Sequence, residues 1–262
     1  LGITQIQIND NPTRWFKSDH RIRVADRVLN EHFAGTYDAW IVLDHVQRPD
    51  GALLQQRVSA TLASAPAAVS EFWREIAPAA DETLDGERLS AIISALEDRL
   101  FDADGDAFDA LDALVRDVES VASEAKYFQR PEVLRWISAM QADLAASGLV
   151  GKSNALPDLV KTVNRELRGG DPADFSIPDR VAGVAQTLLQ FQSSHRPQDL
   201  WHMVTPDFTR AVVWLQLTSG DNQDMTAVLK HVDAYLAEHP VPEGMALQWA
   251  GKTYLNVVWQ DA

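Results

Sequence analysis

The first stretch that could do chemistry is GLVGKS at 148–153, which contains the Gly-Lys-Ser triplet of phosphate-binding loops. In the full pattern G-x-x-x-x-G-K-S, the first glycine would fall on Ala146, where the chain has no glycine. The pattern also requires a preceding strand, whereas the residues before Gly148 have helical periodicity. We therefore expect a helix-to-strand connection here, and no nucleotide cofactor.

A second candidate is the acidic run DADGD at 102–106, because closely spaced aspartates suit a hard cation such as Ca²⁺. If Gly105 occupies the sixth position of a calcium loop, the first and twelfth positions fall on Leu100 and Leu111. Two positions that need oxygen ligands would then be apolar. The run predicts a solvated acidic turn and no metal site.

The histidines and serines offer the remaining catalytic patterns. None of the seven histidines forms H-x-x-x-H or H-E-x-x-H, the spacings that place zinc ligands on one helix face. Ser193, Ser194, His195 and Asp199 lie close in sequence, but no G-x-S-x-G elbow accompanies them. We expect no catalytic residue and predict that the chain is not an enzyme.

Several elements must position these residues, and their periodicity indicates a mixed fold. Strands are expected at 3–8, 37–43, 149–154, 211–217 and 247–259, and helices at 19–33, 131–147, 156–168, 178–192 and 222–239. Ser18 or Asp19 could cap the first helix, and Asn222 the last. Because β-α-β patterns stand at both ends, the sequence predicts an α+β fold of the ferredoxin-like, split β-α-β kind.

The middle of the chain differs in charge and period. Residues 81–124 contain 14 acidic and 3 basic residues, so they carry −11 of the total net charge of −15. Two apolar stripes repeat at helical spacing, one from Leu89 to Leu100 and one from Phe108 to Val121. We expect two helices joined at the DADGD turn, within an acidic helical-hairpin insertion that spans 53–127.

Composition excludes several classes of protein. A net charge of −15 argues against a nucleic-acid partner, because phosphate binding depends on lysine and arginine. The absence of cysteine excludes disulfides and thiolate metal sites. No run approaches the roughly 20 apolar residues that span a bilayer, and no leader peptide is recognisable.

Specific sequence motifs in the first 40 residues and the last third of the chain carry a family resemblance. They are NDNP at 9–12, WF at 15–16, H-x-IRVAD-x-VLN at 20–30, F-x-GTY at 33–37, QSSHRPQDLWHMVTPDF at 192–208, LTSGDNQDM at 217–225 and WAGKTYLNVVWQ at 249–260. Together they resemble the extracytoplasmic porter region of RND-superfamily (MMPL-like) exporters of the bacterial inner membrane. The NDNP start and the VVWQ finish are more similar to the second of the two periplasmic segments in such exporters.

The resemblance implies both an organisation and a role. Residues 1–52 and 128–262 would form the α+β porter domain, on the periplasmic side of the inner membrane, with 53–127 inserted in it. The whole polypeptide would couple proton movement to the export of hydrophobic or lipid-like substrates. The implied partners are the membrane domain of the same polypeptide, the substrate, and a periplasmic protein that contacts the acidic insertion.

The candidate binding residues come from the aromatic side chains, which include eight tryptophans. Most are expected in the core, because buried aromatic area stabilises a mixed fold. Trp15, Phe16 and Trp249 lie near the chain ends, and we take them as candidates for a substrate cleft. The alternative function is a free-standing envelope module that binds a lipid or a protein partner, which the long acidic insertion favours.

Overall fold

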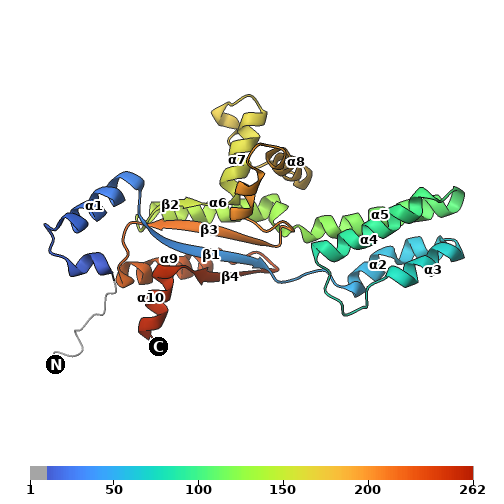
Figure 1. Ribbon diagram of the computed structural model, residues 1–262, viewed down its shortest axis with the longest axis horizontal. Coiled ribbons are helices and arrows are strands. Elements are labelled where there is room, and N and C mark those ends of the chain that lie inside the picture. The colour runs from blue at the N-terminus through green and yellow to red at the C-terminus, as the bar shows by residue number, and fades with distance from the viewer. Residues whose placement is uncertain (1–10, 262) are drawn as a thin grey trace. The chain divides into compact units, whose positions relative to one another are not determined.

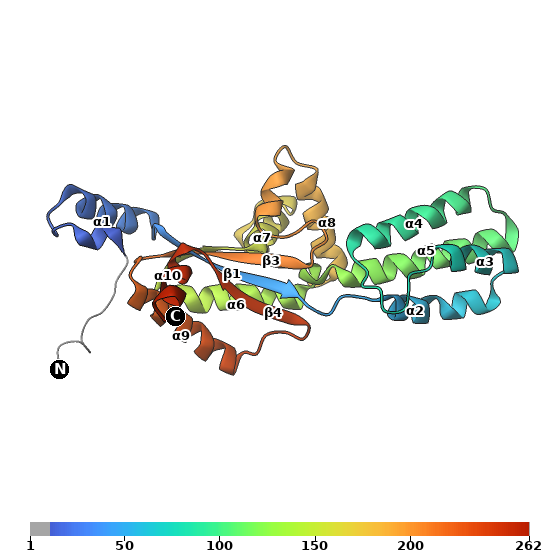
Figure 2. The same ribbon diagram turned by 60° about the horizontal axis from the view of Figure 1, so that its bottom comes forward.

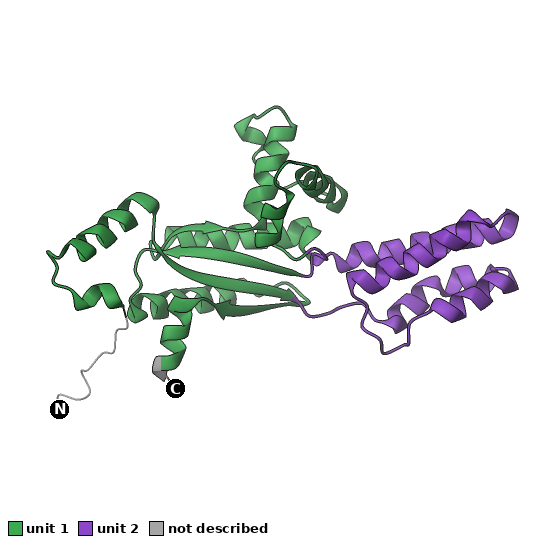
Figure 3. Cartoon of the chain, viewed as in Figure 1, with its two compact units in different colours: residues 1–44, 128–205, 210–262 green, residues 45–127, 206–209 purple. Residues whose placement is uncertain are grey.

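The computed structural model describes residues 11–261, so the strand expected at 3–8 lies outside the described residues. By its internal contacts the chain divides into two compact units (Figure 3). Unit 1 comprises 1–44, 128–205 and 210–262, and unit 2 comprises 45–127 and 206–209. The second unit thus begins at His45 rather than at residue 53, and it includes a short later segment.

Within the described residues, unit 1 contains one four-stranded antiparallel sheet in the order β2-β3-β1-β4 (Figures 1 and 2). Its strands are β1 (Tyr37–His45), β2 (Val150–Asn154), β3 (Arg210–Leu217) and β4 (Met245–Ala250). The two central strands pair in antiparallel register, with Ile41 opposite Val213. The expectation of an α+β fold is therefore confirmed, with long sequence separations between the paired strands.

Alternate residues of the central strands point to a buried face and to a half-exposed one. Ala39, Ile41 and Leu43 of β1 are buried, as are Val213 and Leu215 of β3. Helices α6 (Pro131–Ala146) and α9 (Asn222–Glu238) run along one face of the sheet (Figures 1 and 2). The Nε2 atom of His231 on α9 lies 2.6 Å from Oδ2 of Asp143 on α6, which links the two helices.

The remaining elements of unit 1 surround this sheet. They are the short helices η2 (Pro12–Trp15), η4 (Pro172–Asp174) and η5 (Pro197–His202), and the α-helices α1 (Arg21–Phe33), α7 (Leu156–Leu167), α8 (Val181–Gln192) and α10 (Lys252–Asp261). A further short helix, η3 (Tyr127–Gln129), precedes α6. Helices α7 and α8 lie between β2 and β3 along the chain. They pack against one another and project from the sheet (Figure 1).

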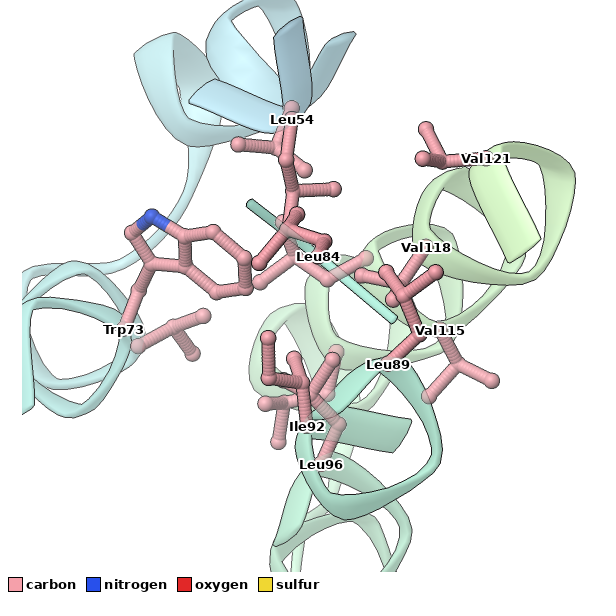
Figure 4. Close-up of a cluster of buried hydrophobic side chains, with 13 residues drawn as sticks. Leu54, Trp73, Leu84, Leu89, Ile92, Leu96, Val115, Val118 and Val121 are labelled. Carbon is pink, nitrogen blue, oxygen red and sulfur yellow. The ribbon is translucent and has the colours of Figure 1, made fainter. Parts of the chain in front are cut away.

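Unit 2 is helical, with α2 (Gly51–Ser64), α3 (Ala67–Ile76), α4 (Gly86–Phe101) and α5 (Gly105–Ala125) in its described residues. The apolar stripes predicted for α4 and α5 supply much of its core, including Leu89, Ile92, Leu96 and Val118 (Figure 4). Leu54 of α2 and Trp73 of α3 complete this core. The expected helical pair is present, but two further helices accompany it.

Three local expectations were wrong. The strand expected at 247–259 ends at Ala250, because Gly251 adopts a left-handed φ of 104° and α10 follows, with Thr253 and Val257 buried one turn apart. Helix α1 is capped by Nδ1 of His20, not by Ser18 or Asp19. Asn222 is the first residue of α9, after Asp221 at the N-cap position.

Candidate functional site

The first described residues of unit 1, from Asn11 on, meet the loop before α9 at a polar junction. Asn11, which is only 4% exposed, donates from Nδ2 to Oδ1 of Asp221 at 2.8 Å. Its own Oδ1 accepts from the backbone N–H and the hydroxyl of Thr13, at 3.1 and 2.8 Å. Two sequence motifs more than 200 residues apart are therefore joined by a hydrogen bond from one buried amide.

Arg14 makes a second contact with Asp221. Its Nε lies 3.2 Å from Oδ1, and its Nη2 lies 2.6 Å from Oδ2, so the guanidinium and the carboxylate form a two-point ion pair. The hydrogen bond with Asp221 raises the pKa of Arg14, and burial partly opposes it. Because the Asp221 side chain is only 14% exposed, this pair is better shielded from solvent than an ordinary surface pair.

Tyr37, from the F-x-GTY motif at 33–37, lies at the same junction. Its hydroxyl donates to Oδ1 of Asp26 at 2.8 Å and lies 3.4 Å from the Thr13 hydroxyl. Burial raises the pKa of Tyr37, so the phenol stays protonated and can keep donating. Gly220 packs against its ring, and a Cβ at Gly220 would lie 2.3 Å from ring atoms. Glycine is thus required there by close packing.

Asp26 and Asn30 of α1 complete the network. Nδ2 of Asn30 lies 3.3 Å from Oδ1 of Asp26, and Oδ1 of Asn30 accepts from the backbone N–H of Thr36 at 2.9 Å. One face of α1 is therefore attached to the start of β1 through polar groups. No residue of α1 is buried, and Ile22, Leu29 and Phe33 are among its exposed apolar side chains.

A cavity of about 450 Å³ opens beside this junction. Its lining is mainly polar, and its charged groups are Arg14, Arg23, Arg27, Asp26 and Glu31. Ser18, Thr218 and Ser219 also line it. The chemistry available there is ion pairing and hydrogen bonding to a polar ligand. We call these residues, with Asn11, Tyr37 and Asp221, the junction site.

The predicted cleft residues lie elsewhere. Trp15 is 72% exposed at the end of η2, and the neighbouring Phe16 stacks on His20 with ring centroids 4.6 Å apart. Trp249 of β4 stacks on Tyr254 at 6.2 Å. None of the three lines the cavity of the junction site, and no ring contact within residues 11–261 links Trp249 to the other two.

The sheet carries an aromatic pair that the sequence did not single out. Trp40 of β1 and Trp214 of β3 are register partners on the half-exposed face, and their rings stack at 5.7 Å. The Nε1 atom of Trp214 is buried without a hydrogen-bond partner among the described residues. Strand alternation could have placed both rings on one face, but the pairing of β1 with β3 was needed to make them neighbours.

Unit 2 has its own cavity, of about 330 Å³. Its apolar wall includes Leu84, Leu89 and Ile93, and Lys126 and Glu119 lie at charged positions around it. Acidic and basic side chains are mixed in this lining, so it favours no single ligand charge. This cavity gives no functional assignment.

The GKS triplet and the DADGD run, which resembled ligand-binding motifs in the sequence, lie in a strand and in a turn. Lys152 and Ser153 lie in β2 opposite Gln216 and Leu215 of β3, so the GKS triplet is part of a strand. Asp102 follows α4 and Asp104 precedes α5, as expected for a turn. Within the described residues, no three His, Asp or Glu side chains gather closely enough to hold a metal ion.

Comparison with known proteins adds no assignment. No family model, no curated protein and no solved structure matches the chain. Among residues 11–261, no helix combines the length and the apolar character that crossing a bilayer requires. The functional argument therefore depends on the residues of the junction site and on the strand order.

Proposed function

We propose that this chain is a periplasmic porter domain of a proton-driven, RND/MMPL-like exporter in the bacterial inner membrane, and that the exporter carries hydrophobic or lipid-like substrates. The observation that carries the proposal is the junction site. One hydrogen-bonded network there joins three of the motifs on which the resemblance to such exporters rests. They are the motifs that contain Asn11, Tyr37 and Asp221. In this proposal they hold the start of the domain against the loop before α9.

The finer description of unit 1 as a ferredoxin-like, split β-α-β sandwich is part of the same proposal. It is supported by the sheet order β2-β3-β1-β4, in which β3 lies between β1 and β2. It is also supported by helices α6 and α9, which precede β2 and β4 in sequence and run along the same face of the sheet. In this fold the long segments after β1 and β2 are insertions into a compact unit.

The partners follow from the proposed role. In this proposal the membrane domain of the same polypeptide supplies the proton pathway, because no helix among residues 11–261 could hold a carboxylate within a bilayer. The acidic helices of unit 2 offer a surface to a periplasmic protein. No catalytic side chain is assigned, since the domain positions a substrate path instead of changing covalent bonds.

The location can be tested with a cysteine label, because the chain has no cysteine of its own. Phe101 is 90% exposed, so Phe101→Cys provides an accessible thiol in this segment of the full-length polypeptide, and the polypeptide without the substitution is the blank. We expect a membrane-impermeant maleimide to label this thiol in intact cells whose outer membrane has been permeabilised. Labelling only after lysis of the inner membrane would reject a periplasmic location.

The export role needs a second experiment in the same cells. The double variant Asn11→Ala/Asp221→Ala removes the central contacts of the junction site, and we expect it to slow energy-dependent efflux of a lipophilic dye. Asp233→Ala, which removes an exposed carboxylate from α9 of unit 1 outside the junction site, is the matched control and should leave efflux unchanged. Equal efflux by the double variant, at equal protein level, argues against the proposal. Efflux that survives deletion of the whole gene would favour the free-standing envelope module.

A further inference from the structure

Arg23 and Arg27 of α1 are four residues apart, so they lie on neighbouring turns of one helix face. Both line the cavity of the junction site, and within the described residues neither forms an ion pair. Like charges at this spacing repel one another and destabilise a helix slightly. Two arginines therefore line the same polar space, and among the described residues neither has an ion-pair partner.

Within the described residues, the carboxylates of the cavity form no ion pair with either arginine. Asp26 accepts hydrogen bonds from Tyr37 and Asn30, and Arg14 is held by Asp221. Glu31 is the remaining carboxylate in the lining, and it forms no ion pair with either arginine within the described chain. Neutral donors leave the negative charge of Asp26 in place, so Asp26 and Glu31 balance the formal charge of the two arginines, while the guanidinium donors of Arg23 and Arg27 remain unused.

Hydroxyl groups supply further donors at the same cavity. Ser18 and Ser219 both line it. The Ser219 oxygen accepts from the backbone N–H of Asp221 at 3.1 Å, which leaves its proton available for a ligand. Guanidinium groups with nearby hydroxyls match the oxygens of a phosphate, because the planar fork can donate two parallel hydrogen bonds to it.

We propose that the cavity of the junction site binds a phosphate group, either on a small soluble molecule or in a phospholipid headgroup, with Arg23 and Arg27 as its main ligands. The volume of about 450 Å³ falls within the range of ordinary ligand pockets. Bound phosphate relieves the repulsion between the two arginines. The inference concerns binding alone and does not depend on the exporter function.

Binding is tested on the 262-residue chain with three probes: inorganic phosphate, sn-glycerol 3-phosphate, and vesicles of equal parts phosphatidylglycerol and phosphatidylcholine. Calorimetry measures the soluble probes, and co-sedimentation measures the vesicles against pure phosphatidylcholine vesicles. Binding of glycerol phosphate indicates a soluble source. Binding only to the vesicles that contain phosphatidylglycerol indicates a headgroup. In both cases affinity should fall as salt rises.

Two variants and one control assign the site. Arg23→Gln and Arg27→Gln should each weaken the observed binding by about tenfold, since a hydrogen bond to a charged group contributes more than a neutral one. Arg21→Gln lies on the same helix but does not line the cavity, and it should bind as the parent does. The melting temperature of unliganded Arg27→Gln should not fall, which separates lost binding from unfolding.

The proposal is overturned if none of the three probes binds. It is equally overturned if Arg21→Gln reduces binding as much as Arg23→Gln and Arg27→Gln do, because general surface charge would then account for the effect.

Discussion

Unit 2 and unit 1 use different means to hold their parts together. Unit 2 packs helices that are neighbours in sequence around one apolar core, with Leu54, Trp73, Leu96 and Leu114 all buried. Unit 1 joins segments from three parts of the chain, and at the junction site it relies on polar groups such as Asn11 and Asp221. Local apolar periodicity therefore describes unit 2 well, whereas unit 1 depends on contacts between distant residues.

The largest structural change that tests this comparison is the excision of unit 2. The rings of His45 and Tyr127, at the two ends of its main segment, stack with centroids 4.3 Å apart, so a short glycine-serine linker can replace 46–126. We expect unit 1 to remain folded. Fluorotryptophan NMR should then show seven dispersed resonances, which is the eight tryptophans of the chain less Trp73. Collapse of these resonances would mean that unit 1 needs unit 2.

A core substitution tests the same independence at single-residue scale. Leu114→Ala in the core of unit 2 should cost about 2–5 kcal/mol in free energy of unfolding, through lost burial and a cavity. In urea titrations followed by fluorotryptophan NMR, the Trp73 resonance should shift its midpoint and the others should not. Leu215→Ala on β3 is the reciprocal control and should move only the unit 1 resonances. A shared midpoint in both variants would contradict two independent units.

The junction site predicts a smaller, steric effect. Gly220→Ala places a methyl group against the Tyr37 ring and should destabilise unit 1 by about 1–3 kcal/mol, as overpacking commonly does. In a Tyr37→Ala background the added methyl group has room, so its cost should largely disappear. Urea unfolding of the four proteins in this double-mutant cycle measures the coupling. Additive effects would show that the two residues do not press on one another.

The smallest effect is expected from an exposed ion pair of unit 2. Arg57 and Glu124 form a two-point pair, but both side chains are substantially exposed. A double-mutant cycle with Arg57→Ala and Glu124→Ala should give a coupling of about 0.2–1 kcal/mol that declines with added salt. Arg14→Ala should lower the free energy of unfolding by more than this, because it removes the ion-pair partner of the shielded Asp221 carboxylate. Equal costs would remove the contrast between the two units.

The sequence predicted most helices and strands but missed several boundaries. Helices α4, α5, α6, α7 and α9 were anticipated within a few residues, because each has a continuous apolar stripe. The end of β4 was missed, since the apolar residues scattered between Trp249 and Trp259 suit a strand or a helix. Only the left-handed backbone at Gly251 separates β4 from α10.

The candidate site was predicted less well than the fold. Trp15, Phe16 and Trp249 were chosen for their type and their position near the chain ends, and the structure does not bring them together. The motifs that contain Asn11, Tyr37 and Asp221 were recognised in the sequence, but the contact between them in the folded chain could not be inferred. Hydrogen bonds between residues this far apart leave no periodic signal in the sequence.

By itself, the sequence determined the α+β class, the helical period of the acidic segment and its charge, because these depend on local composition and on spacings of two to four residues. Only the tertiary structure decided the strand order, the junction of Asn11 with Asp221, and the cavity that Arg23 and Arg27 share. Those features depend on which distant segments pack together, and packing is a property of the whole folded chain.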